Sequence, residues 1–366
     1  MRICHLLASD ACQEDLITIG QLLGRLSACH FEQDVACADG ATAAWAEPVL
    51  GVDVRRLHLR FWGYVGATGP GWTANRRPHL VHVWGGDPTP FRSLLGFDDL
   101  AVVATADPCR AGRSGPHLHL KRLYRRLTLV CDSDAVRDAV VRSGHAASRC
   151  AVVRPTAELD ARHATRPTPT RDLLGLPDDQ PVLLTPGPPS RNGGQYYAVW
   201  AGALLQQLFP DVRLIVPGDA PERIRLERFA RSFELPEIVV CTRHRWSCHE
   251  LMGVADLLAA PALVDGPTGA VARAMAAGLP VVASDIPAMR EVIEDGVTGL
   301  VAPLGQPTKL AGAALRVIED AGLRARLTQA ARQHAAEAYP TSRFVQQYEA
   351  VYERAFAHVR TLAMGR

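Results

Sequence analysis

The sequence contains no C-x-x-C pair, no long uninterrupted apolar run and no large excess of charge of one sign. Its nine cysteines are odd in number and scattered over 366 residues. This argues against a disulfide framework and for reduced, mostly buried thiols in a cytoplasmic protein. No stretch approaches the roughly 18 apolar residues of a membrane span. A net charge of +2 gives no reason to expect binding to nucleic acid.

What the sequence does contain is an ordinary globular composition, with 48% hydrophobic and 21% charged residues. The length fits two domains of usual size. In the opening segment "MRICHLLASDAC" the apolar stretch stops at Asp10, which is too short for the core of a signal peptide. We therefore expect a first β-strand there.

Short apolar runs alternate with longer segments of helical periodicity, which is typical of βαβ units around parallel sheets. In the first half we expect strands at residues 2–7, 52–59, 80–84, 101–105, 127–131 and 150–154, with helices at 16–28 and 134–143. In the second half we expect strands at 181–185, 212–216, 238–242, 257–260, 279–283 and 300–302, and helices at 195–208, 222–233, 308–320, 323–338 and 342–360.

A break in composition separates the two series. The segment "RHATRPTPTRD", residues 162–172, has two prolines and no periodic apolar residues, so it is expected to link two domains. The expected units are residues 1–166, residues 167–340 and a final helix, 341–366, that packs back on the first domain. Two doubly wound α/β domains joined in this way place a ligand cleft between the carboxyl ends of both sheets.

The most informative segment is "LVDGPTGAVARAMAAGLPVVASDIPAMREVIEDGVTGLVAP", residues 263–303. A helix is expected to begin near Gly269, after an irregular loop, and to end at Gly278. Its first amides, from about Thr268 to Val271, suit phosphate oxygens through hydrogen bonds and the positive end of the helix dipole. A glycine loop on its own fits equally well a tight turn against a packed helix.

The words "ARAMAAGLPVVASD" and "EVIEDGVTGLVAP" resemble the nucleotide-sugar signature of the family-four glycosyltransferases, the glycosyl transferases group 1. The resemblance extends over nearly the whole chain, through "MRICHLL", "LVCDSDAVRDAVVRSG", "PDVRLIVPGDAPERIRLERFARSFEL" and "LRARLTQAARQHAAEAYPTSRFVQQYEAVYERA". It implies the GT-B fold, in which two Rossmann-like doubly wound parallel-sheet domains face each other across a cleft. It also implies transfer of a sugar from a nucleoside-diphosphate sugar, with retention and without a metal.

The positions that the resemblance makes catalytic match less well. In the family one Glu contacts the donor sugar and a second Glu binds the ribose, and Asp265 and Arg273 stand at these positions here. Asp265 keeps a carboxylate, whereas the guanidinium of Arg273 can only donate hydrogen bonds. A His-Asp pair of the family corresponds to Ala106 and Asp107. The candidate catalytic residues are therefore Asp265 and Asp107.

In the loop "PGPPSRNGG", residues 186–194, the family holds the donor diphosphate with an Arg and a Lys, and this chain has Pro188 and Gly193 there. Losing two charge-assisted contacts would cost roughly 3–6 kcal/mol unless other groups replace them. Arg191 and Arg273 are the candidate replacements, since guanidinium is well shaped for phosphate. The candidate substrate-binding residues are Gly187, Ser190, Arg191, Asn192, Gly266, Thr268, Gly269, Ala270 and Arg273.

Two functions are open at this point. The first is a glycosyltransferase of the hexosyltransferase type that acts on an unknown glycan, lipid or protein acceptor. The second is a catalytically silent protein of the same fold that serves as a binding or scaffolding partner. Together with a first loop that has no glycine, the departures at the catalytic and cationic positions favour the second. The survival of Asp265, Asp285 and Glu291 leads us to favour the enzyme.

No metal and no cofactor other than the donor is expected, because no Asp-x-Asp cluster is apparent near the candidate site. The pairs His79 with His82 and His117 with His119 lack a nearby Cys or carboxylate to complete a zinc set, so packing explains them better.

The segment "HLHLKRLYRRL" is expected to carry its basic residues, Lys121, Arg122, Arg125 and Arg126, on one helical face. A solvated face is the default interpretation. The alternative is contact with an acidic acceptor or with the inner face of an anionic membrane.

Overall fold

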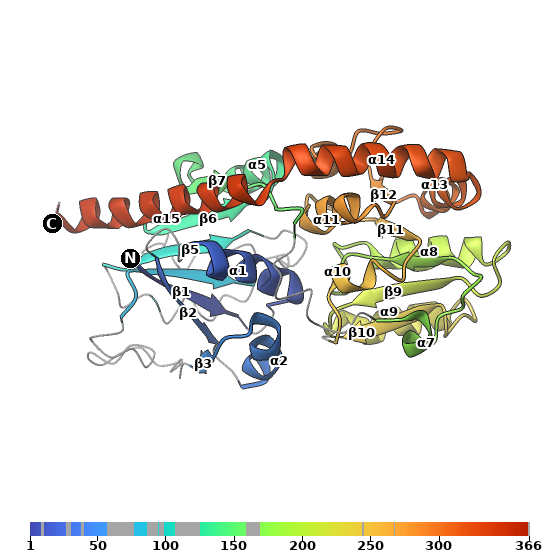
Figure 1. Cartoon of the computed structure of the whole chain (residues 1–366), viewed down its shortest axis with the longest axis horizontal. Helices are drawn as coiled ribbons and strands as arrows, with labels where there is room; N and C mark the ends of the chain where they lie inside the picture. The colour runs from blue at the N-terminus through green and yellow to red at the C-terminus, as the bar shows by residue number, and fades with distance from the viewer. Residues whose placement is uncertain are drawn as a thin grey trace.

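The computed structural model describes residues 1–8, 11–26, 31–37, 40–56, 77–85, 94, 99–106, 125–158, 169–243, 245–266 and 268–364. Within these residues the chain forms two parallel β-sheets, one of seven strands and one of six, which lie side by side along the long axis of the molecule (Figure 1). The expected pair of parallel sheets is confirmed.

The first sheet has the strand order β3-β2-β1-β4-β5-β6-β7, and all its strands are parallel. The order reverses between β1 and β4, whose last residues, Leu7 and Trp84, are paired. The elements of this part are β1 (Arg2–Leu7), α1 (Gln13–Arg25), β2 (Glu32–Cys37), α2 (Gly40–Leu50), β3 (Val54–Arg56), β4 (Leu80–Trp84), β5 (Ala101–Thr105), β6 (Leu127–Cys131), α5 (Asp134–Arg142), the 3₁₀ turn Ala147–Arg149 and β7 (Cys150–Val152).

Both faces of the first sheet are buried, as the nearly continuous apolar strands require. Ile3 and Leu7 of β1 pack in one core with residues of α1 and α2, whereas Cys4 and Leu6 pack in a second core on the opposite face. Because successive side chains of a strand point to opposite faces, one apolar run supplies both cores.

The second sheet has the order β10-β9-β8-β11-β12-β13 and is also parallel throughout. Its order reverses between β8 and β11, and ligands of doubly wound sheets bind outside the carboxyl ends of the strands at such a reversal. The elements are α7 (Arg171–Leu174), β8 (Val182–Leu184), α8 (Gln195–Leu205), β9 (Arg213–Pro217), α9 (Glu222–Arg231), β10 (Val239–Arg243), α10 (Cys248–Leu251), β11 (Leu257–Ala260), α11 (Gly269–Ala277), β12 (Val281–Ser284), α12 (Pro287–Arg290), β13 (Leu300–Ala302), α13 (Pro307–Glu319), α14 (Ala321–Ala338) and α15 (Thr341–Met364).

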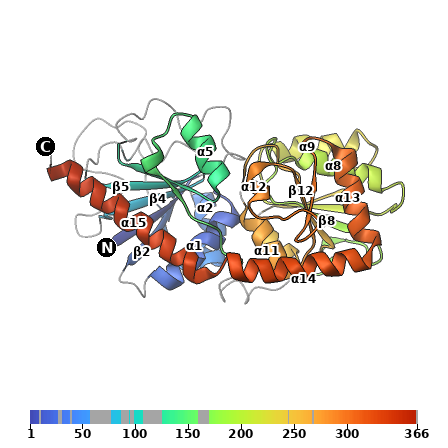
Figure 2. The same ribbon diagram turned by 90° about the horizontal axis from the view of Figure 1, so that it is seen from above.

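The last helix leaves the second domain and packs on the first. Figures 1 and 2 show α14 along the second sheet and α15 along the first, with a short break between them. Phe344, Tyr348 and Tyr352 of α15 belong to the same core as Trp84 of β4. The first domain therefore uses apolar side chains from the far end of the sequence to complete its core.

This core contains a polar network whose histidine, tryptophan and tyrosine side chains are buried. The Nδ1 atom of His82 is hydrogen-bonded to the hydroxyl of Tyr352 at 2.8 Å, and its Nε2 atom to the hydroxyl of Thr105 at 3.1 Å. Trp84 Nε1 donates to Nδ1 of His5 at 3.1 Å. Burial lowers the pKa of His5 to about 4 and the pKa of His82 well below its usual value, so both rings are neutral at pH 7.

Most of the expected strands match the structure to within about two residues, but β2, α2 and the short helices α7, α10 and α12 were not expected. β2 has few apolar residues, and α2 begins with Gly40 and contains Pro48. The hydrophobic periodicity of both segments is therefore weak. The expected linker, residues 162–172, extends past the start of a helix. The Thr170 side chain accepts a hydrogen bond from the amide of Leu173 and caps α7, which begins at Arg171. The expected boundary at 166/167 lies outside the described residues.

Replacing Tyr352 by Phe should lower the free energy of unfolding by about 1–3 kcal/mol, because His82 loses a partner and stays buried. Urea unfolding followed by circular dichroism measures this. The matched control is Tyr197→Phe, since the Tyr197 hydroxyl has no hydrogen bond within the described part of the chain. We expect the control to change the free energy of unfolding by less than about 0.5 kcal/mol. Equal losses in the two variants would contradict this account of the network.

Candidate functional site

The start of α11 lies at the carboxyl edge of the second sheet, after the strand β11 next to the reversal. Its N-cap residue, Thr268, is completely buried, and the helix ends at Gly278 with a φ of 73°. The expected helix from Gly269 to Gly278 is therefore present. The amides of its first turn have no partner inside the helix, so they require an acceptor from outside it.

Arg273 lies one turn into α11, and its guanidinium folds back to the start of the helix. A Cβ atom on Gly269 would lie 3.2 Å from Nη1 of Arg273, so glycine leaves room for the guanidinium. The side chain is only 5% exposed and forms an ion pair with Glu14 of α1, in the first domain. Its Nε atom has no hydrogen-bond partner among the described residues. Burial lowers the pKa of Arg273 to about 10, so it remains charged at neutral pH.

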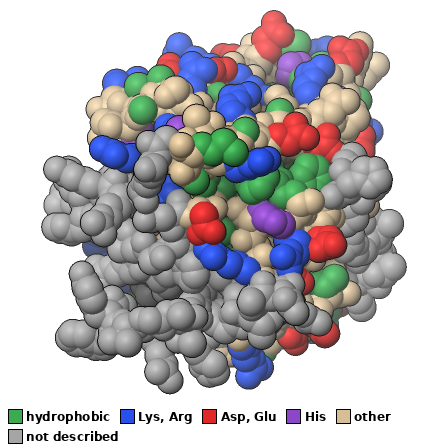
Figure 3. All heavy atoms as spheres, turned by 90° about the vertical axis from the view of Figure 1, so that its left-hand side faces the viewer, with side chains coloured by type: hydrophobic (Ala, Val, Ile, Leu, Met, Phe, Trp, Pro, Cys, Tyr) green, Lys and Arg blue, Asp and Glu red, His purple; other side chains and the backbone are tan. Residues whose placement is uncertain are grey.

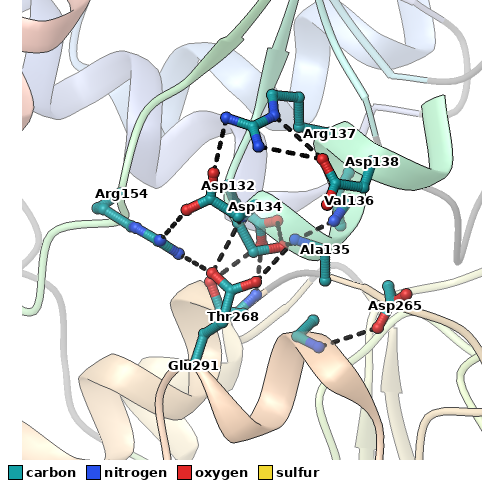
Figure 4. A network of polar contacts seen from close by, with 12 residues as sticks. Asp132, Asp134, Ala135, Val136, Arg137, Asp138, Arg154, Asp265, Thr268 and Glu291 are labelled. Carbon is teal, nitrogen blue, oxygen red and sulfur yellow. Dashed lines mark hydrogen bonds and ion pairs between the residues drawn. The ribbon is translucent and has the colours of Figure 1, made fainter. Parts of the chain in front are cut away.

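Asp265 precedes α11 and is held by the neighbouring helix α12. Its Oδ1 atom accepts a hydrogen bond from the amide of Ala288 at 2.9 Å (Figure 4). Its other oxygen has no hydrogen-bond partner within the described residues. The carboxylate is thus fixed through one oxygen, while the second is available to a ligand.

The loop after β8 is packed tightly against the ends of two neighbouring strands. A Cβ atom on Gly187 would lie 2.1 Å from the carbonyl oxygen of Pro217, and one on Gly194 would lie 1.8 Å from that of Pro261. Only glycine fits at these two positions. The buried Gln195 holds the loop from inside, since its Nε2 donates to Pro186 O at 2.9 Å.

The tip of this loop carries Ser190, Arg191 and Asn192. Ser190 Oγ accepts from the amide of Gly193 at 2.8 Å, and Asn192 O accepts from the amide of Leu263 at 2.8 Å. The side chain of Arg191 is 74% exposed, and its Nε lies 3.2 Å from Glu222 Oε1. Within the described residues Arg191 makes no hydrogen bond or ion pair with α11.

A carboxylate of the first domain accepts hydrogen bonds from Thr268, the N-cap residue of α11. Asp132 follows β6, and its Oδ2 atom accepts from Thr268 N at 2.5 Å and from Thr268 Oγ1 at 3.1 Å (Figure 4). The amide that the sequence assigns to a donor phosphate is therefore hydrogen-bonded to a carboxylate across the domain junction.

The second domain makes the same kind of contact in return. Glu291 accepts from Asp134 N at 3.0 Å and from Ala135 N at 2.7 Å, the first amides of α5. Arg154 forms ion pairs with Glu291 and, at 2.6 Å, with Asp134. Burial would raise the pKa of Glu291, but these hydrogen bonds outweigh it and the pKa lies below its usual value.

The structure brings part of the expected site together. Gly266, Thr268, Gly269, Ala270 and Arg273 surround the start of α11, whereas Arg191 lies apart from them. Asp107 lies outside the described residues. Two residues of the first domain that reach this helix, Asp132 and Glu14, are not among the candidates predicted from the sequence. The sequence gives one indication for Asp132, because this residue directly follows an apolar strand and therefore stands at the carboxyl edge of its sheet.

The expectation that no Asp-x-Asp cluster lies near the site is wrong. Asp132 and Asp134 flank Ser133, and folding brings Asp132 to α11. Their carboxylates are engaged by an amide and by arginines. Within the described ranges, no three His, Cys, Asp or Glu side chains are grouped so as to hold a metal ion. His82 is part of the buried core network, as its packing role predicts.

The expected basic helical face is also corrected. Arg125 and Arg126 form a turn before β6, and Arg126 is buried with Nη1 donating to Leu100 O at 3.4 Å. Lys121 and Arg122 lie outside the described residues. On the end of the molecule seen in Figure 3, Lys and Arg side chains are interspersed with acidic and apolar ones. Across the described segments, every helix is too short or too polar to cross a membrane.

Comparison with known proteins shows the family to which this chain is similar. The family model described as glycosyl transferases group 1 matches residues 169–334. A D-inositol 3-phosphate glycosyltransferase of Xylanimonas cellulosilytica is 31% identical over 327 residues, covering 80% of this chain and 72% of that protein. An alpha-D-kanosaminyltransferase of Streptomyces kanamyceticus is 28% identical over 197 residues, or 53% of this chain and 50% of that protein. The chain thus matches only half the length of this second relative.

Among solved structures, Anabaena Alr3699/HepE in complex with UDP and glucose is similar, with a TM-score of 0.76 and 21% identity over 97% of this chain and 100% of that one. Sucrose-phosphate synthase of Thermosynechococcus elongatus has a TM-score of 0.68 at 17% identity, over 98% of this chain and 100% of that one. These likenesses show the fold, which is the expected GT-B architecture. From the long match to the Xylanimonas enzyme and the family model together, this chain belongs to the glycosyl transferases group 1 family.

Proposed function

We propose that this chain is a retaining glycosyltransferase that moves a sugar from a nucleoside-diphosphate sugar to a glycan, lipid or protein acceptor without a metal. One observation carries the proposal: the buried guanidinium of Arg273 lies against the first residue of α11, at the carboxyl edge of the sheet. A helix start and a buried cation together suit a leaving diphosphate. Support comes from the relatives named as glycosyltransferases and from the UDP and glucose of the similar HepE structure.

The electrostatics favour Arg273 over Arg191 as the principal cation. A diphosphate carries about two negative charges, and a helix start supplies roughly half a positive charge. Arg273 is buried, where charge interactions are strong, whereas Arg191 is exposed and screened by solvent. In the proposal Arg273 binds the diphosphate, and Arg191 contributes from the rim with Ser190, Asn192 and the backbone of the Gly187 loop.

The two candidate carboxylates have different parts in the proposal. Asp265 is fixed by Ala288 N through one oxygen, and its other oxygen orients the donor sugar. Asp107 is the second candidate catalytic carboxylate, and it belongs to the first domain. As the sugar leaves, negative charge builds up on the diphosphate, and the α11 amides and Arg273 stabilise it. Retention is the outcome that membership of the family implies.

Replacing Arg273 by Ala should weaken binding of the preferred nucleotide among UDP, GDP and ADP by about 10- to 150-fold, because a charge-assisted contact is lost. Arg273→Lys should recover part of the loss, since the planar fork is absent. Calorimetric titration measures both. Arg191→Ala is the comparison variant, which removes the same charge from an exposed side chain and should cost less. If Arg273→Ala bound the nucleotide as tightly as the wild type, the diphosphate would have to lie elsewhere.

Replacing Asp265 by Asn should lower the rate of sugar release from the donor by roughly 100-fold or more, as loss of a transition-state contact does. Binding of the nucleotide should change little, because the group faces the sugar. The release of UDP, GDP or ADP from the matching sugar donor measures the rate. Nucleotide binding by wild type with no turnover of any donor would support the silent binding partner instead.

Nucleotide binding should not depend on a divalent metal. We expect affinities in EDTA and in magnesium or manganese to agree within about twofold, because Arg273 and the helix amides supply the positive charge. Titration of the same protein in the three buffers tests this. Binding that disappeared in EDTA and returned with either metal would overturn the metal-independent part of the proposal.

A further inference from the structure

Two carboxylates of the first domain hold the groups that the proposed donor would use. Asp132 accepts from both the amide and the hydroxyl of Thr268, at 2.5 and 3.1 Å. Glu14 pairs with the buried guanidinium of Arg273. The amide of Thr268 and the guanidinium of Arg273 flank Gly269, so one small region presents both positive groups and both anions.

A donor phosphate cannot share this place with the Asp132 carboxylate. The single N–H of Thr268 is already directed at Asp132 Oδ2. A phosphate oxygen at the same amide would bring two negative charges within about 4 Å, where their repulsion is strong in a buried site. The Asp132 carboxylate must therefore leave before a phosphate can bind there.

The neighbouring contacts allow Asp132 to leave without separating the domains. Glu291 holds the first amides of α5, and Arg154 pairs with Glu291, without touching α11. None of these contacts uses the Asp132 side chain. The exchange is thus local, between a carboxylate and a phosphate at one helix start.

We propose that Asp132 is an internal competitor of the donor, which occupies the phosphate position at Thr268 until the nucleotide-sugar displaces it. This inference rests on the proposed function, since it concerns the same site. Asp132 sets the apparent affinity for the nucleotide, because binding must first break its contact with α11. The buried guanidinium of Arg273 lies beside Gly269, and its Nε donor has no hydrogen-bond partner among the described residues, so an incoming anion can use it.

The proposal predicts a gain of binding on losing a carboxylate, which a purely structural cap would not give. Asp132→Asn keeps the shape but replaces a charge-assisted hydrogen bond by a neutral one. We expect it to bind the preferred nucleotide about 5- to 30-fold more tightly than wild type. Asp132→Ala should show a gain in the same direction and guards against a residual amide contact.

Asp134→Asn is the matched control. It removes the same charge two residues away, and its side chain contacts Arg137 and Arg154 rather than α11. Calorimetric titration of wild type and the three variants with UDP, GDP and ADP is the experiment, with melting temperatures to verify folding. We expect the control to stay within about twofold of wild type, since an exposed charge is screened.

The outcomes distinguish a failure of the competitor role of Asp132 from a failure of the proposed function. Tighter binding by the Asp132 variants alone supports the competitor, including the case in which only those variants bind. Unchanged or weaker binding overturns it while leaving the proposed function intact. An equal gain in Asp134→Asn also overturns it, because general electrostatics would then explain the effect. Failure of wild type and all variants to bind any of the three nucleotides would reject the proposed function itself.

Discussion

Asp132 of the first domain accepts the amide hydrogen of Thr268 in the second, and Glu291 of the second domain makes the equivalent contact with the start of α5. Each helix start thus receives a carboxylate acceptor from the other domain, in addition to the Ser133 cap that α5 has from its own domain. A carboxylate at a partly buried helix start contributes up to about 2 kcal/mol. Because both contacts need the same relative placement of the two sheets, they select one arrangement of the domains.

The buried pair of Arg273 and Glu14 imposes the same constraint through charge. A buried ion that loses its partner destabilises a protein by about 3–5 kcal/mol. Arg273 is therefore tolerated inside the second domain only while an anion lies beside it, and in this structure the anion comes from the first domain. The Arg273–Glu14 pair therefore links the inside of the second domain to the position of the first.

The sequence predicts the local elements well and the junction poorly. β1, β4, β5, β6, β11 and β13 have the bounds that their apolar runs predict, since polar residues or turns border each run. β2 is missed because Glu32, Gln33 and Asp34 fill half of it. The start of α11 is predicted from its glycines. Its partner Asp132 is not, because the two segments are 136 residues apart and only domain packing brings them together.

The helix α15 has a consequence for the order in which the chain acquires its structure. His82 and Tyr352, which are hydrogen-bonded in the first core, are separated by 270 positions. The ribosome must therefore synthesise the whole second sheet before the first sheet can bury Trp84 against Tyr348. Although synthesis begins with the first domain, the second is the one that can finish folding earlier on the nascent chain. Until then the apolar face of the first domain that α15 covers stays exposed to solvent.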